Sequence, residues 1–192
     1  MVCTQVLIAV FKSKDEIIIV ELNKSQAASM KLIYDYVTSE YYDLSMLHED
    51  NLWKIEIVLK SPEKPIEKHS ESTLFQEFIE EPRVFAAEKN GKQVGWVEVC
   101  YEKWNNRMRV WEILVQPEHR RNGIGTLLMK KAIAVARERG ARMLVLETQS
   151  CNVPALNFYL KQGFELIGFD IAAYTNDDIQ KHEMRLELGL KL

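Results

Sequence analysis

The alternation of hydrophobic and polar positions predicts most of the secondary structure of the chain. Ile17–Leu22 is almost wholly apolar, which is typical of a buried strand, and Leu52–Lys60 alternates apolar with polar residues, which predicts a strand with one buried face. Two strand patterns flank Asn90-Gly91, a dipeptide typical of tight hairpins. The remaining strand patterns cover residues 107–115, 142–148, 164–171 and 183–190.

Helix signals separate these strands. The predicted helices cover residues 25–38, 73–80, a stretch ending near 139, and 152–162. Ser25 and Asn152 are candidate N-caps, and Gly140 and Gly163 follow the expected C-terminal ends. Residues 61–72 carry two prolines without periodicity and predict a loop. The pattern predicts an α/β fold with a central mixed, mostly antiparallel sheet flanked by helices.

Length and composition favour one domain over residues 1–192 in a reducing cytoplasm. A chain of 192 residues is long enough for one core, and it contains no repeats or linker. The apolar runs Val6–Phe11 and Ile17–Val20 are too short to span a bilayer, and we expect no signal peptide. Cys3, Cys100 and Cys151 are widely spaced and predict neither disulfides nor a zinc site.

Charge is distributed unevenly along the chain. Residues 1–90 hold 10 Lys and Arg against 16 Asp and Glu, a net charge of −6, whereas residues 91–192 hold 15 against 12, a net charge of +3. Most of these charges are expected to lie on solvated surface. The alternative is an acidic half that meets a cationic partner and a basic half that meets an anionic one.

The segment Gln116–Ala132 combines cations, glycines and the start of a helix. Gly123 and Gly125 allow close approach to the backbone, and the first amides of a helix have no intrahelical partner. Arg120 and Arg121 add full positive charges. Together these features predict a diphosphate site at residues 120–126. The segment lacks the Lys-Ser/Thr ending of a P-loop, and Leu128 stands where a dinucleotide fingerprint has its third glycine.

Two sequence blocks resemble the GNAT N-acetyltransferases. In residues 113–129, Arg120, Gly123 and Gly125 match the Arg-x-x-Gly-x-Gly signature of that family. In residues 152–165, its second pattern is matched by Asn152, Ala155, Phe158, Tyr159, Gly163 and Phe164. The resemblance covers about residues 85–169. Within the family, the sequence is most similar to the streptothricin acetyltransferase group.

The resemblance implies acetyl-CoA as co-substrate and a primary amine as acceptor. The residues it assigns to acetyl-CoA are Ile113, Leu114, Val115, Arg120, Arg121, Asn122, Gly123, Ile124, Gly125, Thr126, Asn152, Ala155 and Tyr159. It also implies that the strand ending at Val115 splays from the strand at 143–148, which frees backbone groups for the pantetheine arm and an oxyanion.

Glu112 and Tyr159 are the candidate catalytic residues. An amine with a pKa of about 10.4 must lose a proton before it attacks, and Glu112 lies on the strand beside the expected acetyl site. The alternative is a solvent-facing glutamate paired with Arg107 or Arg109, and Glu98 and Glu147 are rival bases. The resemblance places the Tyr159 hydroxyl beside the departing sulfur as a general acid, whereas the alternative is an aromatic core residue.

Other chemistry has weaker support in the sequence. Cys151 with His119 is a conceivable nucleophile and base, but lone cysteines are more often small buried residues. The histidines show no metal-ligand spacing, and no basic stripe indicates nucleic acid. We expect a small cationic amine acceptor, streptothricin-like first, with no metal, no nucleic acid and no membrane. A protein acetyltransferase, a regulatory module without turnover, and a homodimer stay open.

Overall fold

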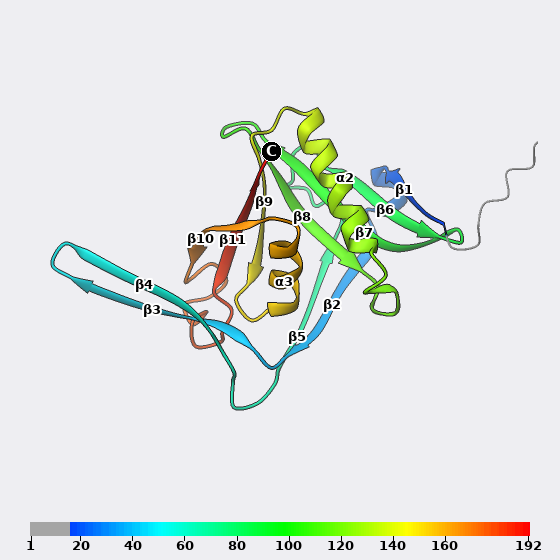
Figure 1. Ribbon diagram of the computed structural model, residues 1–192. Coiled ribbons are helices and arrows are strands. Elements are labelled where there is room, and N and C mark those ends of the chain that lie inside the picture. The colour runs from blue at the N-terminus through cyan, green and yellow to red at the C-terminus, as the bar shows by residue number, and fades with distance from the viewer. Residues whose placement is uncertain (1–15) are drawn as a thin grey trace, which may run out of the picture.

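The computed structural model describes residues 16–192. The expectations for Cys3, for the apolar run Val6–Phe11 and for a signal peptide concern residues outside this range. A seven-stranded sheet with the order β1-β6-β7-β8-β9-β11-β10 forms its centre (Figure 1). The strands are β1 (Ile17–Leu22), β6 (Arg83–Lys89), β7 (Lys92–Glu102), β8 (Arg107–Val115), β9 (Met143–Gln149), β10 (Glu165–Asp170) and β11 (Arg185–Lys191). Only β8 and β9 run parallel, which confirms the predicted mixed, mostly antiparallel sheet.

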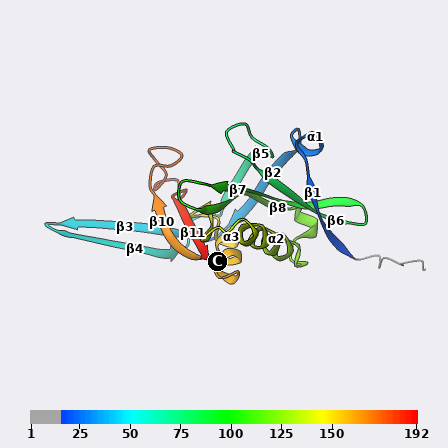
Figure 2. The ribbon, with the colours of Figure 1, turned by 90° about the horizontal axis from the view of Figure 1, so that it is seen from above.

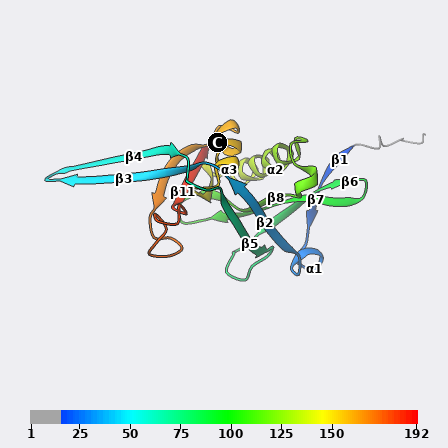
Figure 3. The ribbon, with the colours of Figure 1, turned by 90° about the horizontal axis from the view of Figure 1, so that it is seen from below.

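Different elements cover the two faces of the sheet. Helices α2 (Ile124–Glu138) and α3 (Val153–Lys161) lie on one face, and α1 (Lys24–Ala27) lies on the other with strands β2 (Lys31–Thr38) and β5 (Ile66–Thr73) (Figures 2 and 3). A separate hydrophobic cluster fills each side. The larger cluster contains Leu128 and Met129 of α2, whereas the smaller one joins Leu32 of β2 to Trp96 and Leu114 of the sheet.

Several predicted boundaries are confirmed. Asn90 and Gly91 join β6 to β7 with positive φ angles of 53° and 73°. Gly140 follows α2 with φ 73°, and Asn152 caps α3 by accepting a hydrogen bond from the Ala155 amide. None of the helices in residues 16–192 has the length and hydrophobicity to cross a membrane.

The predicted helix over residues 25–38 is wrong. Asn23, not Ser25, caps the short α1, and its side chain accepts from the Gln26 amide while the Gln26 side chain accepts from the Asn23 amide. The chain then becomes β2, whose alternate side chain Leu32 enters the smaller core. The predicted loop at 61–72 contains most of β5, which pairs with β2 from Lys31↔Thr73 to Thr38↔Ile66. Long-range pairing determines the structure of both segments. The predicted helix over residues 73–80 is also wrong, because Thr73 ends β5 and residues 74–80 form bends and turns.

A second two-stranded ribbon extends away from the body. Strands β3 (Tyr41–Glu49) and β4 (Leu52–Lys60) pair only with each other among the described residues, and their outer half projects into solvent (Figure 1). We call residues 41–60 the arm. The strand β4 was predicted and β3 was not. The expected burial of one β4 face is wrong for this chain alone, since Trp53 is 62 % exposed and Ile55 is 45 % exposed.

Candidate functional site

The centre of the sheet contains the expected gap between strands. The β8–β9 pairing covers only Arg107–Arg109 of β8 and Met143–Val145 of β9, and beyond that point the two strands diverge. On its other edge β8 stays paired with β7, with a bulge at Trp111 between Val110 and Glu112. A bulge bends a strand and increases its twist. The edge of residues 110–115 that faces β9 is therefore not paired with β9, as the splay prediction required, and can contact a ligand.

The N-terminus of α2, where the anion site was predicted, lies next to this gap. Gly123 is the N-cap with φ 79°. Because glycine has no side chain, no capping side chain accepts a hydrogen bond from the first amides of the helix. The Leu127 amide donates the first hydrogen bond within the helix, to the Gly123 carbonyl at 3.1 Å. The amides of residues 124–126 come before it in the chain and have no partner within the helix. Arg120 is held nearby because its Nε donates to the Val115 carbonyl at 3.0 Å. Positive charge and unpartnered helix amides converge there, which suits a phosphate.

One pocket of about 610 Å³ connects the anion site with the splay. Its walls come from β2, β8, the α2 start and α3, and a volume of this size suits a small-molecule ligand. The lining residues are Tyr34–Val37, Ile113–Val115, His119, Arg120, Arg121, Gly123, Gly125, Thr126, Asn152, Pro154, Ala155, Phe158 and Tyr159.

The pocket gathers most of the predicted cofactor residues, with two exceptions. Ile124 is 1 % exposed and packs in the main core, so only its backbone can face a ligand. Asn122 is exposed, and its side chain donates to the His119 carbonyl at 3.4 Å. Gly125 lies close to α3, because a Cβ atom at this position would lie 3.4 Å from the Phe158 ring. A Cβ atom there would be in van der Waals contact with the ring, so a larger side chain would have to extend into the pocket.

Tyr159 lies inside the pocket wall rather than in solvent. Its side chain is 7 % exposed, and it packs against the rings of Phe158 and Phe164. Burial, with a further contribution from the Glu112 charge, raises the pKa of the Tyr159 hydroxyl above its ordinary value. The hydroxyl therefore stays protonated at neutral pH. Tyr159 is thus an aromatic core residue that also lines the pocket, and its role as a general acid stays a prediction.

Glu112 points toward β2 and β5 and does not pair with an arginine. It accepts hydrogen bonds from the Tyr34 hydroxyl at 2.5 Å and from the Ser72 hydroxyl. The alternative of a solvent-facing glutamate is wrong, since Arg107 and Arg109 instead pair with Glu102. Burial raises the pKa of Glu112, and the two hydroxyl donors oppose that shift. Glu112 does not line the pocket itself, but its partner Tyr34 does.

The two rival carboxylates lie in different surroundings. Glu98 is opposite Glu112 in the β7–β8 register and is 0 % exposed, with the Phe75 amide donating to its Oε1 at 2.7 Å. Burial raises the pKa of Glu98 to about 7. Glu147, on β9, makes an ion pair with Arg185 at 2.8 Å, and its charge adds to the rise in the pKa of Glu112. Three carboxylates therefore surround the divergence of β8 and β9.

Sequence reasoning missed the aromatic side chains that β2 adds to the site. Tyr34 and Tyr36 both line the pocket, and Tyr36 donates to the Gln149 side chain on β9 at 2.9 Å. The ribbon of β2 and β5 thus closes the acceptor side of the splay. The alternation of residues 32–38 was the available signal, but the segment was interpreted as a helix.

The other candidate chemistry has no support in the structure. Cys151 is fully buried beside the Tyr36 hydroxyl at 3.4 Å, and burial raises the pKa of its thiol, which disfavours a thiolate. Within residues 16–192, no group of three or more His, Cys, Asp or Glu side chains could hold a metal ion.

Comparison with known proteins identifies a family for the chain. Residues 49–164 match the model of the acetyltransferase (GNAT) family. A streptothricin acetyltransferase of Streptomyces lavendulae is 44 % identical over 85 residues, which is 44 % of this chain and 45 % of that protein. Streptothricin acetyltransferase A of Bacillus subtilis is 38 % identical over 73 residues, which is 38 % of this chain and 42 % of that protein. The matches thus span less than half the length of these relatives.

Solved structures resemble the chain over nearly its whole length. A nourseothricin acetyltransferase has a TM-score of 0.74 at 29 % identity, covering 91 % of this chain and 98 % of that one. A Bacillus anthracis protein assigned as a streptothricin acetyltransferase, solved with acetyl coenzyme A, has a TM-score of 0.74 at 24 % identity, covering 94 % and 99 %. The second likeness shows the shared fold. With the splayed strands, the glycine-rich helix start and the family match together, the chain belongs to the acetyltransferase (GNAT) family.

Proposed function

We propose that this protein transfers an acetyl group from acetyl-CoA to a primary amine of a small cationic acceptor, streptothricin-like in chemistry. One observation carries the proposal. A single pocket of about 610 Å³ runs from the anion site at Gly123 and Gly125, past the free edge of β8, to Tyr159 and Tyr34. The family match and the streptothricin acetyltransferase relatives support the same assignment.

The residues at one end of the pocket fit the diphosphate of acetyl-CoA. A Cβ atom added at Gly123 would meet nothing within 4 Å, so the space in front of the helix amides is open. Arg120 and Arg121 line that space and supply positive charge. The splayed edge of Ile113–Val115 offers backbone groups to an amide-rich pantetheine arm. Asn152 and Ala155, at the start of α3, form the opposite wall.

Acetyl-CoA supplies an activated acyl group, and the residues of the chain manage the protons. Tyr159 holds a proton at its buried hydroxyl and is proposed to donate it to the thiolate of coenzyme A as the acetyl group leaves. Glu112 is proposed to take a proton from the acceptor ammonium. Because the Tyr34 hydroxyl both lines the pocket and donates to Glu112, it links the acceptor space to that carboxylate. Glu147 adds negative charge to the same region, whereas Glu98, whose pKa burial raises to about 7, is only partly ionised at neutral pH.

The acceptor side has the electrostatics that a cation requires. Tyr34, Asp35 and Tyr36 line this end, and the N-terminal half that builds it carries a net charge of −6. Aromatic faces and carboxylates both attract ammonium groups. These features favour a polycationic small molecule over a neutral peptide.

The test is a thiol-release assay with acetyl-CoA against streptothricin, an aminoglycoside, spermidine and a set of peptides. We expect turnover with streptothricin above all the others. We also expect Tyr159→Phe to lower turnover by about 10²–10⁴-fold while the affinity for acetyl-CoA changes little, because the hydroxyl acts as the proton is transferred.

The matched control is Tyr101→Phe, which removes another tyrosine hydroxyl, one that donates to Asn106 far from the pocket. It should retain full activity. Peptide acetylation without any reaction of the cationic amines would replace the proposed acceptor with a protein. Acetyl-CoA binding without turnover on any acceptor would make the chain a binding module, and unchanged turnover of Tyr159→Phe would return this residue to a structural role.

A further inference from the structure

The arm has one apolar face along its whole length. Cross-strand pairing places the even-numbered side chains of β3 on the same face as the odd-numbered side chains of β4. On this face the side chains are apolar at almost every position. The pairs on this face are Tyr42↔Leu59, Leu44↔Ile57, Met46↔Ile55 and His48↔Trp53. The opposite face is mixed, because each of its exposed apolar side chains, Leu47, Leu52 and Val58, is paired with a charged residue. Such a division normally marks a sheet with one covered side.

Only the base of the arm is covered by the body. The Tyr42 amide donates to the Ser150 carbonyl at 3.0 Å, and the Tyr41 ring stacks on His182 at 3.8 Å between centroids. Leu44 and Ile57 still pack against the main core.

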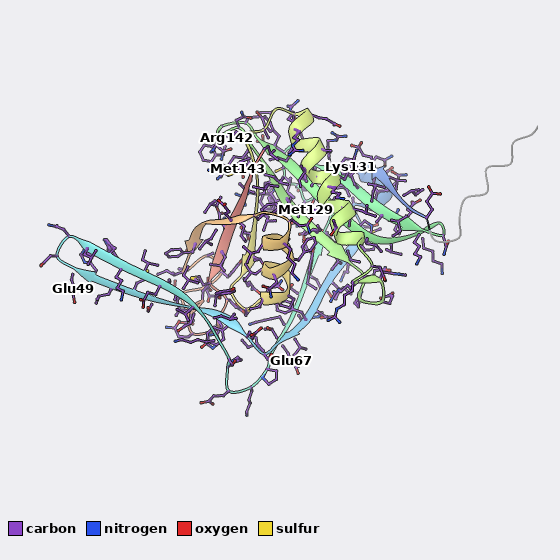
Figure 4. All side chains as sticks on the ribbon, viewed as in Figure 1. Glu49, Glu67, Met129, Lys131, Arg142 and Met143 are labelled. Carbon is purple, nitrogen blue, oxygen red and sulfur yellow. The ribbon has the colours of Figure 1, made fainter. Side chains whose placement is uncertain are left out.

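Beyond these residues the apolar face is open. Met46 is 43 % exposed, Ile55 45 % and Trp53 62 %, and Trp53 stacks only on His48 of the same arm. Figure 4 shows this part of the arm, marked by Glu49, extending clear of the body. A two-stranded hairpin alone is marginally stable in water, so a cover for this face would stabilise it.

A second uncovered apolar surface lies at the same end of the molecule. Strand β10 is an edge of the central sheet, and in all three ribbon views the arm leaves the body next to it and projects beyond it (Figures 1–3). Leu166 is 47 % exposed and Ile167 is 41 % exposed on this strand. An open, apolar edge strand is a site of association unless something covers it.

We propose that the outer arm packs against the β10 surface of a second copy of this chain in a two-fold symmetric dimer. In such a dimer each copy supplies one arm and one β10 surface. The two-fold axis then repeats the same contact twice, and both uncovered surfaces of each copy become buried. The proposal does not depend on the catalytic assignment.

The available area is sufficient for a stable dimer. On the order of 500 Å² of apolar surface per copy comes from six side chains that are each 41–62 % exposed, namely Met46, Trp53, Ile55, Leu59, Leu166 and Ile167. Because interfaces are only about 60 % apolar, this corresponds to roughly 800 Å² per partner, the size of a standard interface.

Charge argues against a lipid surface as the partner. The arm carries four acidic residues and two basic ones, a net charge of −2 that anionic lipid would repel. The acidic and basic side chains of the mixed face also pair among themselves, as Lys60 does with Asp43 at 2.6 Å and Lys54 with Glu56 at 3.1 Å. A second copy, which brings its own apolar β10 surface, fits better.

Sedimentation equilibrium of the full chain between 1 and 100 µM tests the proposal. We expect a mass near twice 22.4 kDa for the parent. The variant Met46→Thr/Ile55→Thr replaces one cross-strand pair on the apolar face and should raise the dimer dissociation constant at least 100-fold. Its control, Ser45→Thr/Glu56→Thr, replaces the adjacent pair on the opposite face and should leave the constant unchanged.

Disulfide trapping decides the matter even if the arm variant fails to fold. In a Cys3→Ser background, one preparation carries Ile55→Cys and a second carries Ile167→Cys, so that a bond between these sites joins two copies. Mild oxidation of the mixture should give the crosslinked heterodimer in preference to either homodimer. A parent that stays monomeric at 100 µM, a dimer that the Met46/Ile55 variant leaves intact, or the absence of the mixed crosslink would each overturn the proposal. A monomer that binds vesicles of phosphatidylcholine and phosphatidylglycerol would assign the face to lipid instead.

Discussion

Glu98→Gln should change how the stability of this protein depends on pH. The Glu98 carboxyl is fully buried between the sheet and the β2–β5 side, and it faces Glu112 across the β7–β8 pair. Its Oε1 accepts from the Phe75 amide, whereas its Oε2 has no hydrogen-bond partner among the described residues. Glutamine keeps the acceptor for Phe75 and removes the ionisation.

The magnitude follows from the pKa of this carboxyl. Burial raises the pKa from its ordinary 4.5 to about 7 in the folded chain. Between these two values the unfolded chain has released its proton while the folded chain still holds it, so rising pH favours unfolding. The stability that Glu98 contributes is fully present below pH 4.5 and is lost by about pH 7. At 1.36 kcal/mol per pH unit the loss is about 3 kcal/mol.

Urea unfolding at pH 5 and pH 8 measures this effect. The free energy of unfolding of Glu98→Gln, relative to the parent, should be higher at pH 8 than at pH 5 by up to about 3 kcal/mol. Glu63→Gln, at an exposed loop position, is the control and should show no such difference. The same relative stability of Glu98→Gln at both pH values would refute the argument that a buried, proton-holding carboxyl lies beneath the site.

Two further predictions concern the ligands. Gly125→Val should weaken acetyl-CoA binding at least tenfold by calorimetry, because the added side chain would occupy the narrow space beside Phe158, whereas Lys130→Val, an exposed position on the same helix, should bind normally. Unchanged binding by a folded Gly125→Val would remove the diphosphate from this helix start. The Michaelis constant for the cationic acceptor should rise with ionic strength more than that for acetyl-CoA, since charges on the acceptor side are screened over about 10 Å at 0.1 M salt. A salt-independent constant would contradict the electrostatic argument for a polycation.

The turns and helix starts of the segment proposed to bind the cofactor were predictable because their signals are local. The glycines at 123 and 125, the Asn152 cap and the Asn90-Gly91 turn each determine backbone geometry within a few residues. Pairing limited to Arg107–Arg109 also confirmed the splay, an expectation that came from the family resemblance.

The acceptor half depends on contacts between distant segments, and sequence reasoning failed there. Strand β5 has a polar sequence and forms because β2 pairs with it over eight positions, and Lys31 pairs with Glu71 at 2.9 Å. The hydrogen bonds from Tyr34 and Ser72 to Glu112 span 78 and 40 residues of sequence. No local pattern reports such partners. The sequence therefore suggested only nearby arginines as an alternative partner for Glu112, and that alternative is wrong.

The chain path has a consequence for engineering. Strands β1 and β6 are neighbours in the sheet, and their register brings Leu22 opposite Val84, yet sixty residues separate them along the chain. Everything that builds the acceptor wall and the arm is thus one insertion whose two ends meet at adjacent strand positions. When the two ends of an inserted segment lie side by side, the segment can be exchanged with little disturbance of the domain that carries it. Transplanting residues 23–83 from another family member offers a way to change the acceptor while the cofactor machinery is retained.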